Sequence, residues 1–128
     1  MQQATRKKIK SFTDLITWQE GHKLVIAIYN TTKSFPADEK FGLTSQLRRA
    51  AVSVTSNIAE GFGRKSENEK LNFYSIAQGS VTEVQNQLLV ARDVQYLNNE
   101  TFQSLAADSI RTHKLLGGLM KSIRDRVE

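Results

Sequence analysis

The sequence predicts an all-α protein, an antiparallel four-helix bundle with up-down-up-down topology. Apolar residues recur every three or four positions along four successive segments, which is the spacing of one helix face. No segment shows the period-two alternation that a half-buried strand requires. The 128 residues hold a single proline, Pro36, so long helices can follow it without interruption. The connections between the segments are short, and sequence neighbours should therefore pack antiparallel.

The first helix is expected over residues 14–34. Its predicted core line follows alternating spacings of three and four: Leu15, Trp18, His22, Val25 and Tyr29. The pair Phe35-Pro36 should end this helix, because a residue that precedes proline is pushed out of helical geometry.

The second helix is expected over residues 44–62. Its predicted core line is rich in small residues: Leu43, Leu47, Ala50, Ala51, Val54, Ile58 and Gly61. A neighbouring helix can therefore approach this line closely. We expect Gly61 and Gly63 to end the helix in a left-handed cap, a conformation that glycine adopts at little cost.

The third helix should begin with a capping box, in which Ser66 and Glu69 each satisfy a backbone N–H of the other. It should continue to about Val94. Its core line is predicted to be Tyr74, Ala77, Val81, Val84, Leu88 and Ala91.

The fourth helix should follow an asparagine N-cap at residues 98–99 and end near Arg126. Its predicted core line is Phe102, Leu105, Ser109, His113, Leu116, Met120 and Ile123. The sequence thus divides into a disordered basic N-terminal tail, residues 1–11, and one bundle domain, residues 12–128.

A second line on the third helix is rotated by about 100° from the core line. Its residues again follow three-four spacing: Phe73, Ile76, Ser80, Glu83, Gln87 and Val94. We interpret this line as a subunit interface of a homo-oligomer. The alternative is a wide core face with scattered surface apolar residues, which are common on soluble proteins.

Polar side chains flank the core line of the second helix and meet a carboxylate of the third. The set consists of Arg49, Asn57, Glu60 and Glu83. Polar groups at the edge of a packed seam need partners, because an unpaired buried one costs about 1–3 kcal/mol. We therefore expect a structural polar network here, in preference to a catalytic pair of carboxylates.

Three stretches carry a family resemblance. They read FGLTSQLRRAAVS at residues 41–53, SNIAEG at 56–61 and AQGSVTE at 77–83. Together with Trp18, Tyr29 and Phe35-Pro36, they make the chain similar to the four-helix bundle proteins encoded in intervening sequences of 23S ribosomal RNA genes. The resemblance covers about residues 12–125. One departure is Thr55, where the family often carries proline, so the second helix should be straighter here.

The resemblance implies a cytoplasmic bundle that assembles as a homopentameric ring. It also brings in a relative, the accessory variability protein of diversity-generating retroelements, which works with a reverse transcriptase and its template RNA. That relative raises the expectation of nucleic-acid binding, although a shared fold does not transfer function.

Chemistry that bundles often house is missing from the sequence. There is no cysteine, and neither His22 nor His113 has a glutamate three residues before it, as a di-iron site requires. We expect both histidines to lie in the core, with no metal and no cofactor. No nucleophile elbow or phosphate-binding glycine loop occurs. The protein is therefore not expected to be an enzyme, and no apolar run is long enough to span a membrane.

The net charge of +5 is distributed unevenly, with four cations in the first ten residues. The candidate nucleic-acid-binding residues belong to the second and fourth helices and the segment between the second and third: Arg48, Arg49, Arg64, Lys65, Arg111, Lys114, Lys121 and Arg124. One hypothesis is that these patches, repeated around a ring, bind structured RNA, or DNA, through phosphates. The alternative is a scaffold that docks a partner protein through its helix faces.

Overall fold

The computed structural model describes residues 8–127 of the chain. Within this part, four long helices and two short 3₁₀ helices form and no strand occurs. The long helices are α1 (Ile16–Thr32), α2 (Leu43–Phe62), α3 (Glu67–Asp93) and α4 (Asn99–Val127). The 3₁₀ helices Phe12–Asp14 and Ala37–Glu39 precede α1 and α2. The predicted all-α four-helix architecture is confirmed.

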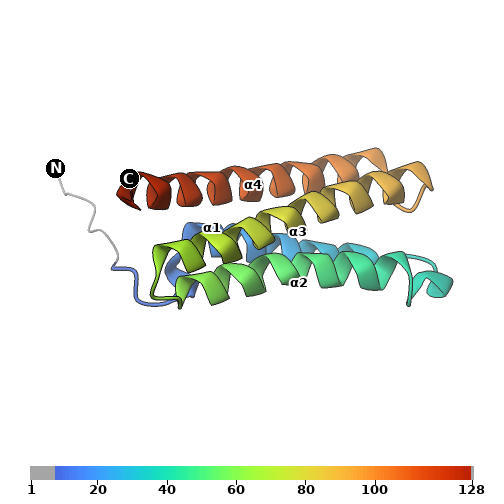
Figure 1. Cartoon of the computed structure of the whole chain (residues 1–128). Helices are drawn as coiled ribbons and strands as arrows, with labels where there is room; N and C mark the ends of the chain where they lie inside the picture. The colour runs from blue at the N-terminus through green and yellow to red at the C-terminus, as the bar shows by residue number, and fades with distance from the viewer. Residues whose placement is uncertain (1–7, 128) are drawn as a thin grey trace.

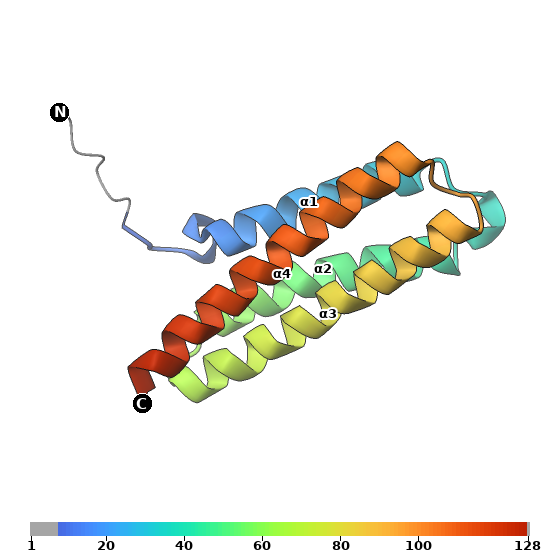
Figure 2. The ribbon, with the colours of Figure 1, turned by 90° about the horizontal axis from the view of Figure 1, so that it is seen from above.

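Each long helix packs against two others, so that the four surround one core. Helix α1 contacts α2 and α4, and α3 contacts the same two helices. Successive helices run in opposite directions (Figure 1). As a result, the start of α1, the α2–α3 connection and the end of α4 lie at one end of the bundle (Figure 2).

The predicted core lines of α2, α3 and α4 are confirmed with two exceptions. Leu43 is only partly buried against the core, and His113 is half-buried while its neighbour Thr112 is fully buried. All six predicted residues of α3 are buried, from Tyr74 to Ala91. The three-four spacing of apolar residues therefore predicted the core faces of α2, α3 and α4.

The predicted core line of α1 is confirmed at Val25 and in part at Leu15 and Trp18, which are partly buried against the core, and it is wrong at His22 and Tyr29. The residues that α1 buries are Thr17, Gly21, Leu24, Val25, Ile28 and Thr32. His22 is exposed and Tyr29 is 39% exposed. The cause is the close contact with α2, because a Cβ at Gly21 would lie only 3.2 Å from Thr55 Cγ2. This approach favours small side chains and leaves His22 and Tyr29 at the surface.

Aromatic side chains at the start of α1 pack on one another, and Trp18 among them also packs against the core. The Trp18 and His22 rings are stacked at 4.6 Å, and Phe12 meets Trp18 edge-on at 5.5 Å. The predicted core role of His22 is therefore replaced by a surface stack. Arg48 covers the Tyr29 ring farther along the same helix, with 4.6 Å from its guanidinium carbon to the ring centroid.

The helix ends follow the predicted caps in part. Ser66 accepts the Glu69 N–H at 3.0 Å, but the Glu69 carboxylate lies 3.9 Å from Arg64 and no bond to the Ser66 backbone forms. Asn98 accepts the Thr101 N–H at 2.7 Å and so caps α4 as expected. Gly63 ends α2 with a φ of −80°, which corrects the predicted left-handed cap. Ser11, the last residue of the predicted disordered tail, caps the first 3₁₀ helix, and residues 1–7 of that tail lie outside the described part.

A carboxylate that precedes α2 holds two parts of the chain together. Glu39 accepts the Leu43 N–H at 3.0 Å and the Tyr96 hydroxyl at 2.7 Å. These two bonds, the backbone one first, hold the pKa of Glu39 below its ordinary 4.5. Glu39 therefore supplies the N-cap that Gly42 lacks and ties the start of α2 to the α3–α4 connection.

The lowered pKa of Glu39 predicts a dependence of stability on pH. A carboxyl whose pKa is lower in the folded chain contributes stability above its unfolded pKa, and that stability is lost as the pH falls through the folded pKa. We expect the melting temperature of the parent to exceed that of Glu39→Gln near neutral pH. The difference should shrink as the pH falls below 4.5. Thermal melts of both proteins across this range test the prediction, and a constant difference would contradict it.

Candidate nucleic-acid interface

Three separate chain segments that carry basic residues meet at the end of the bundle that holds the start of α1, the α2–α3 connection and the end of α4; Figures 1 and 2 show the course of these segments. We call this region the basic end. Its cations are Lys8, Lys10, Arg64, Lys65, Lys70, Lys121, Arg124 and Arg126. The antiparallel topology brings them together, since residues more than fifty positions apart in sequence meet there. Arg126 Nη2, for example, lies 2.9 Å from Glu67 Oε2.

Several cations of the basic end have partners that fix their positions. Lys70 Nζ donates to the carbonyls of Gly61 at 3.3 Å and Phe62 at 2.7 Å, and so satisfies the C-terminus of α2. Lys121 pairs with Asp125 at 3.1 Å along α4. Contacts within the chain therefore anchor both side chains.

Arg64 is held by two carboxylates and an aromatic ring. It lies 3.1 Å from Glu60 and 3.9 Å from Glu69, and its guanidinium carbon stands 4.6 Å from the centroid of the Phe73 ring. Lys65 and Arg124 differ from it, because both are exposed and neither has an ion-pair partner among the described residues. Lys8 and Lys10 are likewise exposed and without an ion-pair partner there, so no carboxylate of the described residues neutralises these four charges.

Two of the predicted nucleic-acid-binding residues lie on α2 and are engaged elsewhere. Arg48 donates from Nε to Thr32 Oγ1 at 2.8 Å and from Nη2 to the Tyr29 carbonyl at 3.4 Å. Arg49 Nη2 lies 3.7 Å from Glu83 Oε2. The structure places both far along α2 from Arg64, so they do not join the basic end.

The α4 cations of the prediction also divide into two groups. Arg111 Nη1 is 3.0 Å from Glu20 and 3.2 Å from Asp108, so carboxylates of its own chain neutralise it. Hydrogen bonds from Lys23 and then Arg111 lower the pKa of Glu20. Lys114 is exposed, has no ion-pair partner among the described residues and lies midway along α4. Of the eight predicted residues, the structure gathers Arg64, Lys65, Lys121 and Arg124 at the basic end.

The predicted polar network forms only in part. Arg49 pairs with Glu83 as expected, but Glu60 pairs with Arg64 instead of joining them. Asn57 donates to the Ser53 carbonyl at 2.8 Å and stays within α2. Glu60 does not join the predicted network because it lies near the end of α2, one turn before Arg64.

A hydrogen bond between two serine hydroxyls links α2 and α3, and the sequence analysis did not predict this pair. Ser53 Oγ and Ser80 Oγ are 2.8 Å apart, and Asn57 Nδ2 lies 3.1 Å from Ser53 Oγ. Small hydroxyl side chains at facing positions permit this close helix contact and satisfy each other inside it.

The predicted subunit-interface line is divided by the α2–α3 contact. Ile76 and Val94 are 46% and 50% exposed, and Glu83 is exposed between them. Phe73 is partly buried beneath Arg64. Ser80 and Gln87 are buried within the bundle itself, which corrects their assignment to a free face. Gln87 Oε1 is buried there without a hydrogen-bond partner among the described residues.

Metal and membrane features are absent from the described residues. No group of three or more His, Cys, Asp or Glu side chains that could hold a metal ion occurs among residues 8–127. Within the same range, no helix is long and apolar enough to cross a membrane.

Comparisons with known proteins agree with the bundle geometry. The family model described as 23S rRNA-intervening sequence protein matches residues 13–118. A search of curated proteins found no match. Among solved structures, the chain is similar to a protein of unknown function from the S23 ribosomal protein family of Bacteroides thetaiotaomicron VPI-5482. The TM-score is 0.77 and the identity 22%, over 83% of this chain and 96% of that chain. Because the family model spans most of its length, the chain belongs to the 23S rRNA-intervening sequence protein family.

Proposed function

We propose that this protein binds structured nucleic acid, RNA in preference to DNA, through the phosphates that contact its basic end, and that it does so without catalysis. The observation that carries the proposal is the convergence of cations from three chain segments, with Lys65 and Arg124 left without carboxylate partners among the described residues. Cations that their own chain does not neutralise favour phosphate binding. The description of the family, which refers to 23S rRNA, favours RNA.

The proposal includes a homopentameric ring in the cytoplasm. Support for self-association comes from the outer α2–α3 face, where Ile76, Val90 and Val94 are exposed around the Arg49–Glu83 pair. A ring would repeat the basic end around its axis, and weak phosphate contacts would add by avidity on one long RNA.

Light scattering tests the ring separately from RNA binding. We expect a mass of about five times the 14.4 kDa chain at micromolar concentration. The variant Ile76→Asp should lower that mass, because it places a charge on the apolar face. A monomeric parent would overturn the ring and leave binding by a single basic end in place.

The same apolar face favours a second candidate function, a scaffold for a partner protein. Ile76, Val90 and Val94 would then contact the partner instead of another copy. The two functions differ in their salt dependence, because apolar contacts are largely insensitive to salt and phosphate contacts are not.

The affinity for nucleic acid as a function of salt tests the main proposal. We expect the full chain to bind a folded RNA, with log affinity falling against log salt with a slope of roughly −3 to −4 if about four phosphates are engaged. A DNA duplex of equal length should bind more weakly. Absence of binding to either at low salt would overturn the proposal.

A further inference from the structure

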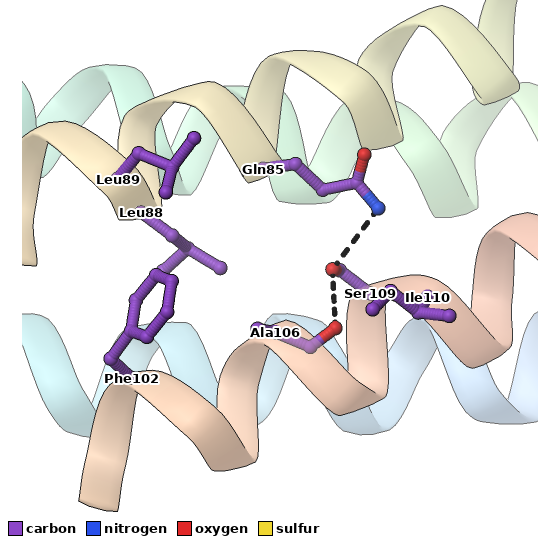
Figure 3. Close-up of a pocket in the computed structure, with 7 residues that line it drawn as sticks. All are labelled: Gln85, Leu88, Leu89, Phe102, Ala106, Ser109 and Ile110. Carbon is purple, nitrogen blue, oxygen red and sulfur yellow. Dashed lines mark hydrogen bonds between the residues drawn. The ribbon is translucent and has the colours of Figure 1, made fainter. Parts of the chain in front are cut away.

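Two pockets in the bundle differ in their chemistry. The groove between α3 and α4 has a volume of about 250 Å³ and is apolar apart from Gln85 and Ser109 (Figure 3). These two side chains bond to each other, with Gln85 Nε2 donating to Ser109 Oγ at 3.3 Å. No charged side chain among the described residues lines this groove, so it does not select a ligand by charge.

The second pocket lies where α1 ends and α2 begins, at the end of the bundle opposite the basic end (Figure 1). Its volume is about 230 Å³. We call it the α1–α2 pocket. Its lining includes three cations and two threonines, namely Lys33, Lys40, Arg48, Thr32 and Thr44.

The Arg48 guanidinium is fixed at the wall of the α1–α2 pocket. Its Nε donates to Thr32 Oγ1 at 2.8 Å, and Thr32 Oγ1 donates to the Ile28 carbonyl at 2.7 Å. Nη2 donates to the Tyr29 carbonyl at 3.4 Å, and the Tyr29 ring lies against the guanidinium. Nη1 makes no hydrogen bond to a described residue. The side chain is therefore oriented within the chain and still has N–H groups for a ligand.

Thr44 presents an unpaired hydroxyl to the same pocket. The residue is 8% exposed, and its hydroxyl makes no hydrogen bond to any described residue. The hydroxyl is not fully enclosed, because Gln87 Oε1 alone among the described side-chain atoms is both enclosed and unpaired. It therefore opens onto the pocket that Thr44 lines. Buried polar groups normally have partners, so this hydroxyl indicates a place for a ligand.

The first turn of α2 adds hydrogen-bond donors beside Thr44. The Leu43 N–H bonds to Glu39, but the N–H groups of Thr44 and Ser45 have no partner among the described residues. Free N–H groups and the positive end of the helix dipole favour an anion at this position.

Two carboxylates precede α2 without neutralising the α1–α2 pocket. Neither Asp38 nor Glu39 lines it, and the two Glu39 oxygens accept from the Leu43 N–H and the Tyr96 hydroxyl. Lys33 and Lys40 are exposed and have no ion-pair partner among residues 8–127. The three cations of the lining are therefore unopposed within it.

We infer that the α1–α2 pocket binds a dianionic phosphate group, as inorganic phosphate or as the phosphate of a small monoester. Three cations, a hydroxyl and free N–H groups match the charge and the acceptor oxygens of such a group. A phosphodiester of an RNA backbone carries one charge and two substituents, and it matches this pocket less well. The ligand is therefore separate from the RNA of the proposed function, and the inference does not depend on that function.

Isothermal titration calorimetry of the full chain at constant ionic strength and neutral pH tests the site. Inorganic phosphate and glycerol phosphate are titrated separately, and the tighter of the two identifies the source of the phosphate group. Dimethyl phosphate, a monoanionic diester, should bind much more weakly than either. Equal binding of all three, or no saturable binding of inorganic phosphate and glycerol phosphate, would overturn the inference.

The variant Thr44→Val removes the unpaired hydroxyl and keeps the shape of the side chain. It should weaken phosphate affinity about tenfold or more, since a hydrogen bond to a charged group contributes on this scale. The matched control Thr31→Val removes a hydroxyl from the same end of α1, outside the pocket, and should keep the affinity. Unchanged affinity in a folded Thr44→Val protein would contradict the assignment.

A pair of double variants keeps the inference testable if Thr44→Val unfolds. Lys33→Gln with Lys40→Gln removes two exposed cations of the pocket, and Lys65→Gln with Lys121→Gln removes two from the basic end. The first should lose phosphate binding and the second should retain it. Equal losses, or a larger loss in the second, would overturn the pocket assignment. RNA binding by the same proteins should show the reverse pattern, so failure of this inference and failure of the proposed function are distinguishable.

Discussion

Replacing Gly61 by valine is expected to lower the free energy of unfolding by about 3 kcal/mol, the upper part of the usual range for overpacking. A Cβ at this position would lie 2.7 Å from Tyr74 Cε1 and 3.0 Å from Phe73 Cβ. Tyr74 is almost fully buried and cannot swing aside, so α2 and α3 would have to separate. Chemical denaturation measures the loss, and the melting temperature should fall by about 10 °C.

The control for this prediction is the same substitution at Gly118 in α4. A Cβ there meets nothing within 4 Å, and the residue is exposed. Valine has a somewhat higher helix propensity than glycine, so Gly118→Val should change stability by less than about 1 kcal/mol. If Gly61→Val proved as stable as Gly118→Val, the close approach of α2 to α3 would be wrong.

The double charge reversal Lys65→Glu with Arg124→Glu is expected to weaken RNA binding about tenfold or more at low salt. Both side chains are exposed cations without ion-pair partners among residues 8–127. Removing one phosphate contact should reduce the magnitude of the salt slope by about one, so the double variant should reduce it by about two. Filter binding or fluorescence anisotropy across a salt series gives both quantities.

The matched control is Lys33→Glu with Lys40→Glu, at the opposite end of the bundle. These lysines are also exposed, and the control changes the net charge by the same amount. It should weaken binding only slightly, through the overall charge. Equal reductions in affinity for the two double variants would show that net charge governs binding and that the basic end has no special part.

The core line of α3 was predictable although a second line runs along the same helix. The six residues of the core line, from Tyr74 to Ala91, are all buried as predicted. On α1, two lines compete, and the contact of Gly21 with Thr55 decides between them. That contact joins two helices, and no pattern within α1 alone reveals it.

The candidate site was predictable only in its residue types. Lysine and arginine content identified the cations, but their neutralisation depends on distant partners. Arg111 pairs with Glu20, 91 residues earlier, and Arg126 with Glu67, 59 residues earlier. The spacing of residues within one helix cannot predict ion pairs that join two helices. The antiparallel topology, which was predicted, would have placed the α2–α3 connection beside the end of α4.

Lysine footprinting of the RNA complex tests the central claim most directly, because it reads the contact surface of the unaltered chain. The protein is treated with an acetylating reagent with and without folded RNA, and modification is measured by mass spectrometry. We expect RNA to protect Lys65 and Lys121 while Lys33 and Lys40 react as in the free protein. Protection confined to Lys33 and Lys40, or no protection at any of the four, would contradict binding at the basic end.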